Sequence, residues 1–434
     1  MIGPDAVHDT LRKYQLVDGY PLVLDLQRSE GVWMLDAVTG KRFLDAFSFF
    51  ASWPMGYNHP MLVDANFQAE LARAATTKVA NSDIYTTLMA EFVDTFGSKV
   101  TPAGFPHHFW ISGGALAVEN GLKTAFDWKA RKLGRTSFDE DVNDLVILHF
   151  RQAFHGRSGY TISVTNTVPD KIGLFPKFPW PRVHNPAIVF DLDGGIANDI
   201  EAEEQRACDK IEAAFAAHPG KVAAILIEPM QGEGGDNHFR GEFLARLRDY
   251  ADKNEALLVY DEVQTGFFAS GKTWWWQLSD VAPDICIFGK KTQICGIYAS
   301  ERIDEVAGNV FSLSSRINST WGGSLVDMVR CRRFIEIIEQ EDLAANIAEM
   351  GDRMVTGLRG IASATGAFTN TRGRGSLIAV TLETPDQRNA LLNRMFEHEF
   401  LALPTGPESI RFRLPYVVGA DEIDEMLNRV EASL

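Results

Sequence analysis

Two adjacent lysines follow an apolar segment of the sequence. Residues 284–291 read DICIFGKK, so a strand-like run ends in Lys290 and Lys291. A lysine that emerges from a buried strand is costly to keep as a cation unless a counter-charge lies beside it or its pKa is lowered. An amine with a lowered pKa suits Schiff-base chemistry. A solvated strand end is the alternative, and the alternation of side chains does not tell which lysine points inward.

A carboxylate ends a second apolar segment, residues 256–265, which read ALLVYDEVQT. Open α/β sheets bind their ligands beyond the carboxyl ends of the strands, and Asp261 is expected to lie there. A carboxylate in that place can hold a cationic ring nitrogen or a metal ion. The alternative is an ordinary carboxylate that caps the following helix.

A glycine-rich turn follows a third strand-like segment and precedes apolar residues at helical spacing. Residues 110–115 read WISGGA, which predicts Ser112 as the N-cap of a helix. The free backbone N–H groups at the start of this helix would form a site for an anion such as phosphate. An ordinary capped strand-to-helix turn is the alternative.

Two arginines are placed to bind carboxylates. Arg157 lies in FHGR just after the strand-like LVILHF, and Arg411 alternates with apolar neighbours in SIRFRL. A guanidinium group can grip a carboxylate through two parallel hydrogen bonds. For each arginine, a structural salt bridge is the alternative.

A possible nucleotide-binding loop lies at residues 266–273. Its sequence, GFFASGKT, matches the phosphate-binding pattern G-x-x-x-x-G-K-[ST]. The strand that ends in Asp precedes this loop instead of following it, and the aromatic residues of the loop and of Trp274 to Trp276 would crowd a phosphate. We interpret the match as chance, and a P-loop nucleotide hydrolase stays as a remote alternative.

Strand-like and helix-like segments alternate through most of the chain, which is typical of a parallel sheet with crossover helices. The clearest predicted strands are residues 107–111, 145–149, 222–228, 256–261 and 284–288. Beyond them we expect helices at 326–339, 343–361, 386–398 and 421–434, with strands at 377–382 and near Leu401 and Ile410. Residues 21–27 and 31–35 look like pieces of a hairpin. The predicted division is an N-terminal segment (1–55) that packs on the small domain, a large domain (56–325) and a small α+β domain (326–434).

The composition excludes several classes of partner. The 434 residues carry a formal net charge of −16 without a Lys/Arg-rich run, so we expect neither nucleic acid nor an anionic membrane as a partner. No apolar run approaches the roughly 18 residues of a spanning helix, and the N-terminus does not read as a signal peptide. Four cysteines without metal-ligand spacing favour a cytoplasmic location and no metal site.

The order of these motifs, a glycine-rich turn, then Asp261, then Lys290, resembles the class III (ω-)aminotransferases, which are pyridoxal-phosphate enzymes of fold type I. The resemblance runs over nearly the whole chain. The matching stretches are SGGALAVENGLKTA, AFHGRSGYT, ILIEPMQGEGGD, LLVYDEVQTGF, FGKK and NSTWGG. The resemblance implies an α/β fold with a large cofactor-binding domain around a mainly parallel sheet, a smaller α+β domain, and a homodimer with shared active sites.

The resemblance also implies a role for each residue that matches a family motif. Lys290 would form the Schiff base with pyridoxal 5'-phosphate and then move a proton, while Asp261 would pair with the ring nitrogen. Phe154 would stack on the ring and Gln264 would bond to its 3' oxygen. Thr320 would reach the phosphate across the dimer interface. The implied cofactor-binding residues are Gly114, Ala115, Phe154, Asp261, Gln264, Lys290 and Thr320.

Two segments indicate the substrate. The segments FFASGKTWWW and KTQICG differ from the usual family pattern. They resemble the corresponding segments of those family members that act on the 6-amino group of lysine. The implied reaction, a step of lysine catabolism, moves this group from L-lysine to 2-oxoglutarate. It gives L-glutamate and 2-aminoadipate 6-semialdehyde, which cyclises to 1-piperideine-6-carboxylate. An ornithine or 4-aminobutyrate ω-aminotransferase is the nearest alternative, because a slot distinguishes one or two methylenes by only about 1–3 kcal/mol. A non-catalytic cofactor-binding protein is the weakest alternative.

The two substrates would share one site. Arg157 would hold the α-carboxylate of lysine, and Arg411 would hold the carboxylate beside the keto group of 2-oxoglutarate. An unused Arg411 beside an aliphatic chain would be an unpaired, partly desolvated charge. Glu233 would therefore neutralise it with lysine and swing away with 2-oxoglutarate, with freedom from its glycine neighbours at 232, 234 and 235. The implied substrate-binding residues are Arg157, Glu233, Arg411, Asn318 and Ser319.

Overall fold

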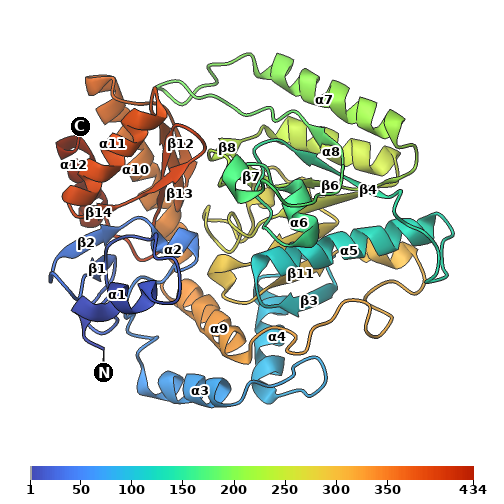
Figure 1. Cartoon of the computed structure of the whole chain (residues 1–434), viewed down its shortest axis with the longest axis horizontal. Helices are drawn as coiled ribbons and strands as arrows, with labels where there is room; N and C mark the ends of the chain where they lie inside the picture. The colour runs from blue at the N-terminus through green and yellow to red at the C-terminus, as the bar shows by residue number, and fades with distance from the viewer. Residues whose placement is uncertain (1) are drawn as a thin grey trace.

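The structure, a computed structural model, describes residues 2–434 (Figure 1). Its centre is a seven-stranded sheet in the order β3-β11-β10-β9-β6-β4-β5. All neighbouring strands run parallel except the two pairs that β11 forms with β10 and β3, so the predicted α/β fold with a mainly parallel sheet is confirmed. The strands are β3 (His107–Ile111), β4 (Val146–Phe150), β5 (Arg182–Val183), β6 (Val222–Ile227), β9 (Leu257–Asp261), β10 (Ile285–Phe288) and β11 (Cys295–Ala299).

Five of these strands, β3, β4, β6, β9 and β10, coincide with predicted segments. Every residue of β6 is apolar and buried, as expected of a strand that is covered on both faces. β11 is not among the predicted strands. It returns antiparallel to β10 after the loop that contains Lys290, and Gly296 lets it lie against β3, because a Cβ there would come within 2.1 Å of the carbonyl oxygen of Phe109.

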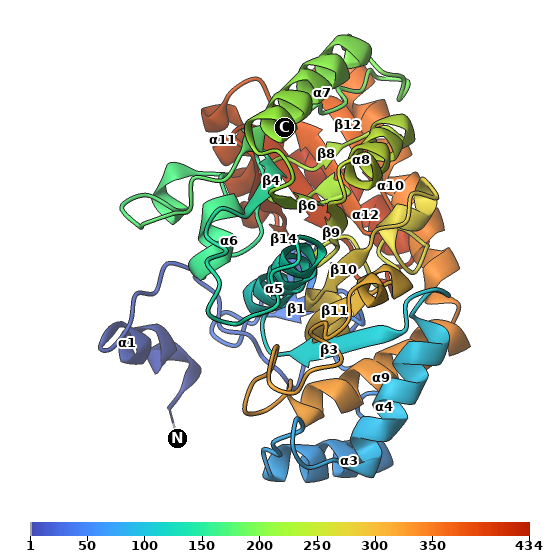
Figure 2. The same ribbon diagram turned by 90° about the vertical axis from the view of Figure 1, so that its right-hand side faces the viewer.

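Helices cover both faces of the sheet (Figure 2). α5 (Gly114–Lys132) covers one face, where it packs with Leu226 of β6. α7 (Ile200–Ala217) and α8 (Gly241–Lys253) cover the other, where they pack with Ile225. Successive residues of one strand thus enter two separate cores, because side chains alternate along a strand.

The C-terminal part forms a second unit around a four-stranded antiparallel sheet in the order β12-β13-β16-β15. The predicted helices and strands of this part are confirmed. Its elements are α9 (Leu325–Gln340), α10 (Leu343–Thr365), β12 (Thr369–Arg374), β13 (Leu377–Thr381), α11 (Pro385–Glu397), β14 (Phe400–Leu401), β15 (Leu403–Thr405), β16 (Ser409–Arg413) and α12 (Ala420–Ala432). α9 leads into this unit and packs on α3 (Ala65–Thr76) and α4 (Thr87–Lys99).

Residues 33–45 lie against this second unit (Figure 1), whereas residues 7–12 project away from the body in Figure 2. β1 (Trp33–Leu35) and β2 (Arg42–Asp45) form a hairpin, and β2 pairs in parallel with β14. The predicted hairpin piece at residues 21–27 is confirmed only in part: it is not a strand, but Leu24 forms an antiparallel bridge with Asp36, flanked by backbone hydrogen bonds from Asp25 to Leu35 and from Ala37 to Val23. The remaining short elements are α1 (Val7–Arg12), α2 (Ser48–Ala51), α6 (Gly159–Val164), β7 (Met230–Gln231) and β8 (Asn237–His238), with 3-10 turns at Pro4–Ala6, Pro169–Lys171, Trp275–Leu278, Lys290–Thr292 and Glu301–Glu305.

α2 is a left-handed turn without a glycine. Its four residues have φ values of 44°, 48°, 60° and 63°, a conformation that costs roughly 1–2 kcal/mol per residue. Asp45 stabilises the turn, because its Oδ1 accepts hydrogen bonds from the backbone N–H groups of Phe47 at 2.7 Å and Ser48 at 2.8 Å. The Ser48 hydroxyl donates to the carbonyl of Arg413, so the turn lies directly against β16.

Replacing Asp45 by alanine is expected to lower the free energy of unfolding by about 3 kcal/mol, because two backbone N–H groups lose their acceptor where Asp45 is buried. Asp45→Asn keeps one acceptor oxygen and should lose less. Urea denaturation of the three proteins tests this. Equal stabilities would show that Asp45 does not stabilise the turn.

Among residues 2–434, no helix is long and apolar enough to cross a membrane. The same residues contain no group of three or more His, Cys, Asp or Glu side chains that could hold a metal ion.

Candidate active site

A cavity of about 450 Å³ opens at the carboxyl edge of the central sheet. The loops after β3, β4, β6, β9 and β10 all reach it, since the carboxyl ends of these strands point to the same edge. Seven of the predicted site residues line it, although they come from parts of the chain as far apart as α5 and β10. They are Gly114, Ala115, Phe154, Arg157, Asp261, Gln264 and Lys290.

The two lysines after β10 point to different places. Lys290 lines the cavity, and it adopts a left-handed backbone conformation with φ 55°. Burial, together with the positive charges of Arg411 and Arg413, lowers the pKa of Lys290 to about 8. Lys291 is only 2% exposed, and its Nζ donates to the backbone carbonyl of Gln264 instead. Only Lys290 therefore presents its amine to the cavity.

Asp261 is held in place by a histidine. Its Oδ2 lies 2.8 Å from Nδ1 of His155, and its Oδ1 accepts a hydrogen bond from the backbone of Val263 at 3.0 Å. One oxygen thus caps the turn after β9, and the carboxylate still borders the cavity. His155 is buried, and its Nε2 has no hydrogen-bond partner in the part of the chain that the structure describes.

The N-terminus of α5 faces the cavity, but its N-cap differs from the prediction. The helix begins at Gly114, and the N-cap is Gly113 with φ 103°, a conformation that favours glycine. Ser112 lies one residue too early and is exposed, so the prediction of a serine cap is wrong. No side chain accepts a hydrogen bond at this cap, and the first N–H groups of Gly114 and Ala115 stay available to an anion.

Arg411 is buried and pairs with Glu233. Its Nη2 lies 2.8 Å from Oε2 of Glu233, and its Nη1 donates to Oε1 of Gln264 at 3.1 Å. The other carboxylate oxygen of Glu233 accepts from Lys171. Burial alone would raise the pKa of Glu233, but Arg411 and Lys171 together hold it below its usual value. Arg157, in contrast, is exposed at the cavity and makes no ion pair among residues 2–434.

The glycines around Glu233 do not give the loop freedom, contrary to the expectation from the sequence. A Cβ at Gly234 would lie 1.8 Å from the carbonyl oxygen of Gln152, and one at Gly232 would lie 2.3 Å from Oε1 of Gln264. These glycines therefore allow close packing of the loop. The backbone is further fixed, because Gly406 donates to the carbonyl of Glu233 at 3.1 Å.

Two further parts of the site were missed by the sequence patterns. Arg413 pairs with both oxygens of buried Asp236, at 2.5 and 2.7 Å, and also donates to Oε1 of Gln264 at 2.8 Å. Glu228 lines the cavity, and its two oxygens accept from the backbone of Phe154 at 2.9 Å and Gly232 at 3.0 Å. Burial raises the pKa of Glu228 to about 7. The place of Glu228 after an apolar strand, like that of Asp261, was the available signal.

Asn318, Ser319 and Thr320 do not line this cavity. They lie in the loop before α9, where Ser82 donates to the carbonyl of Ser319 at 2.8 Å. The neighbouring Trp321 is 46% exposed. Within one chain, these three residues are therefore not brought together with the other predicted site residues.

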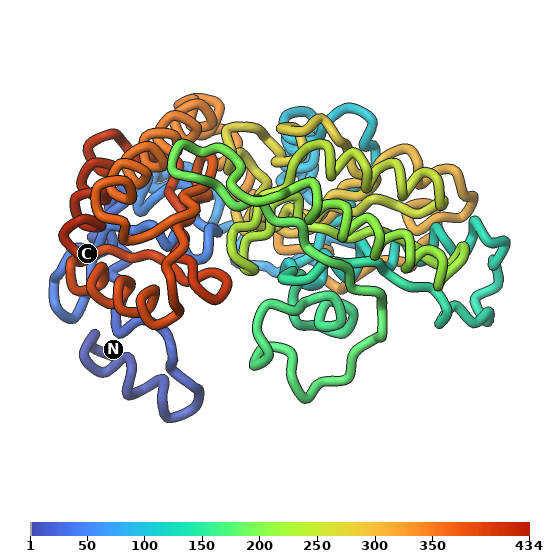
Figure 3. The backbone as a smooth tube through the Cα atoms, turned by 90° about the horizontal axis from the view of Figure 1, so that it is seen from above, coloured from blue at the N-terminus to red at the C-terminus, as the bar shows by residue number. Residues whose placement is uncertain are grey.

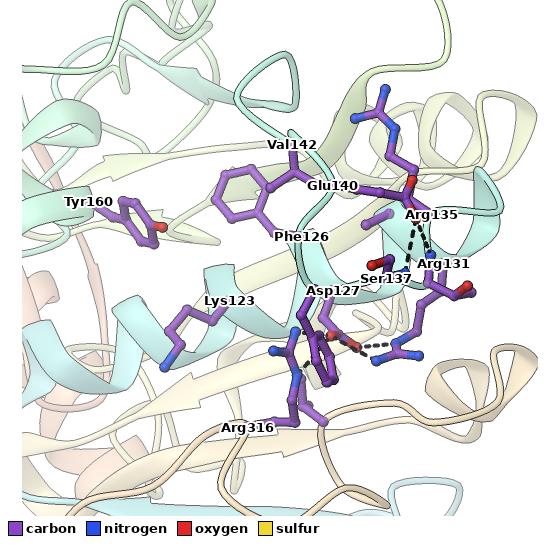
Figure 4. Close-up of a pocket in the computed structure, with 14 residues that line it drawn as sticks. Lys123, Phe126, Asp127, Arg131, Arg135, Ser137, Glu140, Val142, Tyr160 and Arg316 are labelled. Carbon is purple, nitrogen blue, oxygen red and sulfur yellow. Dashed lines mark hydrogen bonds and ion pairs between the residues drawn. The ribbon is translucent and has the colours of Figure 1, made fainter.

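A second cavity, of about 280 Å³, lies near the C-terminal end of α5 and is drawn in Figure 4. Its centre is Asp127, which pairs with Arg131 at 2.8 Å and with Arg316. No predicted site residue lines it, and its central charges pair with one another. This cavity is therefore not the candidate active site.

The nucleotide-hydrolase alternative fails on the surroundings of its loop. A phosphate-binding loop leads from a strand into a helix whose N–H groups bind the phosphates, whereas residues 266–273 lead into a 3-10 turn at Trp275–Leu278. A Cβ at Gly266 would lie 2.5 Å from the ring of Trp274, which is fully buried. The loop is thus filled by aromatic side chains.

The fold and this site define a pyridoxal-phosphate enzyme of fold type I. The sequence model of the family described as aminotransferase class-III matches residues 14–434, and the chain belongs to that family. It is 49% identical to an L-lysine-epsilon aminotransferase of Amycolatopsis lactamdurans, over 100% of this chain and 96% of the relative. It is 31% identical to the mitochondrial 4-aminobutyrate aminotransferase of Mus musculus, over 93% of this chain and 83% of the relative. Among solved structures, a lysine aminotransferase of M. tuberculosis in the internal aldimine form matches with a TM-score of 0.95 and 46% identity, over 100% of this chain and 99% of the other.

Class III aminotransferases use pyridoxal 5'-phosphate, and the cavity has a group for each part of it. The uncapped N-terminus of α5 suits the phosphate, and the amine of Lys290 suits the aldehyde. The Asp261 carboxylate suits a protonated ring nitrogen, and the ring of Phe154 can stack on the cofactor. The residues present therefore fit this cofactor.

Proposed function

We propose that the chain transfers the 6-amino group of L-lysine to 2-oxoglutarate and gives 2-aminoadipate 6-semialdehyde and L-glutamate. Relatives that are 49% and 47% identical to this chain support the donor, because they are named for lysine. The observation that carries the proposal is the contrast between the two arginines at the site. Arg157 lines the cavity and forms no ion pair with the described residues, whereas Arg411 is paired with Glu233, which masks it. A donor with one carboxylate needs one arginine, and an acceptor with two carboxylates needs both.

Bound pyridoxal phosphate supplies a carbonyl carbon that takes up the amino group and a ring that accepts electron density from the substrate carbon. We assign the proton transfers at that carbon to the amine of Lys290. Asp261 keeps a proton on the ring nitrogen, and His155 fixes the orientation of the Asp261 carboxylate. The N–H groups of Gly114 and Ala115 bind the phosphate, and Phe154 holds the ring from one face.

Gln264 has a defined orientation for its assigned role. Its Oε1 accepts from both Arg411 and Arg413, so its Nε2 is the group left to donate to the 3' oxygen of the cofactor. Arg157 binds the α-carboxylate of lysine, which leaves the distal amine at the cofactor. Arg411 binds the carboxylate beside the keto group of 2-oxoglutarate after Glu233 has moved.

We further propose that the active unit is a homodimer, in which Thr320 binds the phosphate and Asn318 and Ser319 reach the substrate from across the interface. The distance of these three residues from their own cavity supports this arrangement. Ile84 and Tyr85 are 68% and 73% exposed beside the same loop, which favours a partner surface there. Four free, buried cysteines support a cytoplasmic location.

Product analysis tests the proposed substrate pair. The holoenzyme is incubated with 2-oxoglutarate and, in separate reactions, with L-lysine, L-ornithine or 4-aminobutyrate, and kcat/KM is compared. We expect the highest value with lysine and the cyclic product of the 6-semialdehyde in the mass spectrum. A higher value with either of the other donors would replace lysine by that donor and keep the reaction class.

The lowered pKa of Lys290 predicts the pH dependence of cofactor attachment. The cofactor-free chain should attach pyridoxal phosphate at a rate that rises with pH and levels off above about 8, where the Lys290 amine has lost its proton. N-α-acetyllysine, whose pKa is about 10.4, should react with a rate that still rises in this range. Stopped-flow absorbance measures both. A rate for the protein that also rises up to about pH 10 would contradict the lowered pKa.

A further inference from the structure

Glu233 bridges two cations from different parts of the chain. Its Oε2 lies 2.8 Å from Arg411 on β16, and its Oε1 accepts from the ammonium group of Lys171. Lys171 ends the 3-10 turn Pro169–Lys171, in the segment between α6 and β5 that protrudes from the body in Figure 3. The Lys171 ammonium also lies 5.5 Å from the ring centroid of Phe154, which places it at the rim of the cavity.

The surroundings of Glu233 make its release from Arg411 costly without a second partner. The Glu233 side chain is 20% exposed, so a carboxylate that leaves Arg411 does not simply enter bulk water. A partly buried charge that loses its counter-ion is strongly destabilised. Lys171, with 33% of its side chain exposed, already touches the oxygen that does not contact Arg411.

The backbone around Glu233 restricts how the release can occur. Thr405 Oγ1 donates to the carbonyl of Gly232 at 2.6 Å, and Gly406 donates to the carbonyl of Glu233 at 3.1 Å. A loop movement would break both contacts and open the close packing at Gly234. Rotation of the Glu233 side chain leaves these backbone contacts and the packing at Gly234 intact. It can break the pair with Arg411 while one carboxylate oxygen stays on Lys171.

We propose that Lys171 is a positioning residue that holds Glu233 while a dicarboxylate occupies Arg411. The proposal rests on the proposed function and deepens it, because it names the group that lets the Arg411–Glu233 pair break and form again. Without Lys171, Arg411 is the one cation among residues 2–434 that still pairs with Glu233, and the dicarboxylate must break that pair without compensation. A substrate that leaves Arg411 masked does not need Lys171.

Binding of glutarate to the holoenzyme tests the proposal directly, because glutarate has both carboxylates of 2-oxoglutarate and no group that reacts. Isothermal titration calorimetry should show roughly 10- to 100-fold weaker binding for Lys171→Met, in line with the loss of a charge-assisted contact. Lys171→Arg keeps the charge and should restore binding. Lys177→Met is the matched control from the same segment, because within the described part of the chain the Lys177 ammonium bonds to the carbonyls of Ile172 and Phe175 and to no carboxylate.

The half-reactions provide a second readout. For Lys171→Met, the glutamate concentration that gives half-maximal bleaching of the cofactor band should rise by the same factor as the glutarate dissociation constant. The corresponding L-lysine concentration should stay unchanged. The proposal would be overturned if Lys171→Met bound glutarate with wild-type affinity. It would also be overturned if the half-maximal concentrations of glutamate and lysine rose by the same factor. A wild-type holoenzyme that reacts with glutamate but not with lysine would instead refute the proposed function, and the glutarate comparison would still decide the role of Lys171.

Discussion

Replacement of Lys290 by alanine is expected to lower the rate of transamination by about 10⁴-fold or more, because the site loses its nucleophile and the group that moves protons at the substrate carbon. The phosphate and ring contacts do not involve this amine, so pyridoxal phosphate should still bind, without a covalent bond. Absorbance spectra before and after denaturation with acid distinguish the two binding modes, and single-turnover kinetics with L-lysine give the rate.

The matched control is Lys291→Met. Lys291 is buried away from the cavity and bonds to a backbone carbonyl, so its loss should affect stability more than chemistry. We expect Lys291→Met to keep the covalent cofactor and a rate within about tenfold of the wild type. If Lys290→Ala retained near-normal turnover while Lys291→Met lost it, the assignment of the two lysines would be reversed.

Glu233→Ala has the second large expected effect, and it should change the rates of the two half-reactions differently. Arg411 would lie unpaired beside the aliphatic chain of lysine, so the lysine half-reaction should slow by roughly 100-fold. The rate of the glutamate half-reaction should stay the same or rise, because no carboxylate has to be displaced from Arg411. Cofactor binding should change little, since Glu233 does not line the cofactor cavity.

Stopped-flow spectra with L-lysine and with L-glutamate measure these rates separately. Glu233→Gln is the control for side-chain size, because it fills the same space without the charge and should behave like Glu233→Ala. If both half-reactions of Glu233→Ala ran at wild-type rates, Glu233 would not mask Arg411 and the account of dual substrate recognition would be wrong.

Much of the fold could be predicted because the central strands are short apolar runs with polar residues at their carboxyl ends. The same rule placed Asp261 at one edge of the sheet. It did not distinguish Lys290 from Lys291, and only the family resemblance assigned the cofactor to Lys290. Arg411 was recognisable by its alternation with apolar neighbours in β16. Strand patterns carry such information because burial on both faces of a sheet excludes polar side chains except at the ends.

Other features depend on contacts between distant segments, and no local pattern encodes them. Lys171 meets Glu233 only through folding, from an exposed segment with ordinary composition. The left-handed turn at Ser48–Ala51 contains no glycine, so nothing in its residues indicates positive φ values. The helix cap at Gly113 was missed because a serine was the stronger local signal, whereas the sharp turn after β3 requires the glycine.

The most direct test of the central claim is a visible absorbance titration of the purified holoenzyme, first with L-lysine and then with 2-oxoglutarate. We expect the band of the bound cofactor to bleach with lysine and to return with the keto acid, because one site serves both substrates in turn. A band that ignores lysine but bleaches with ornithine or 4-aminobutyrate would contradict the proposed donor. A protein that stays colourless after incubation with pyridoxal phosphate would contradict the account of the site as a whole.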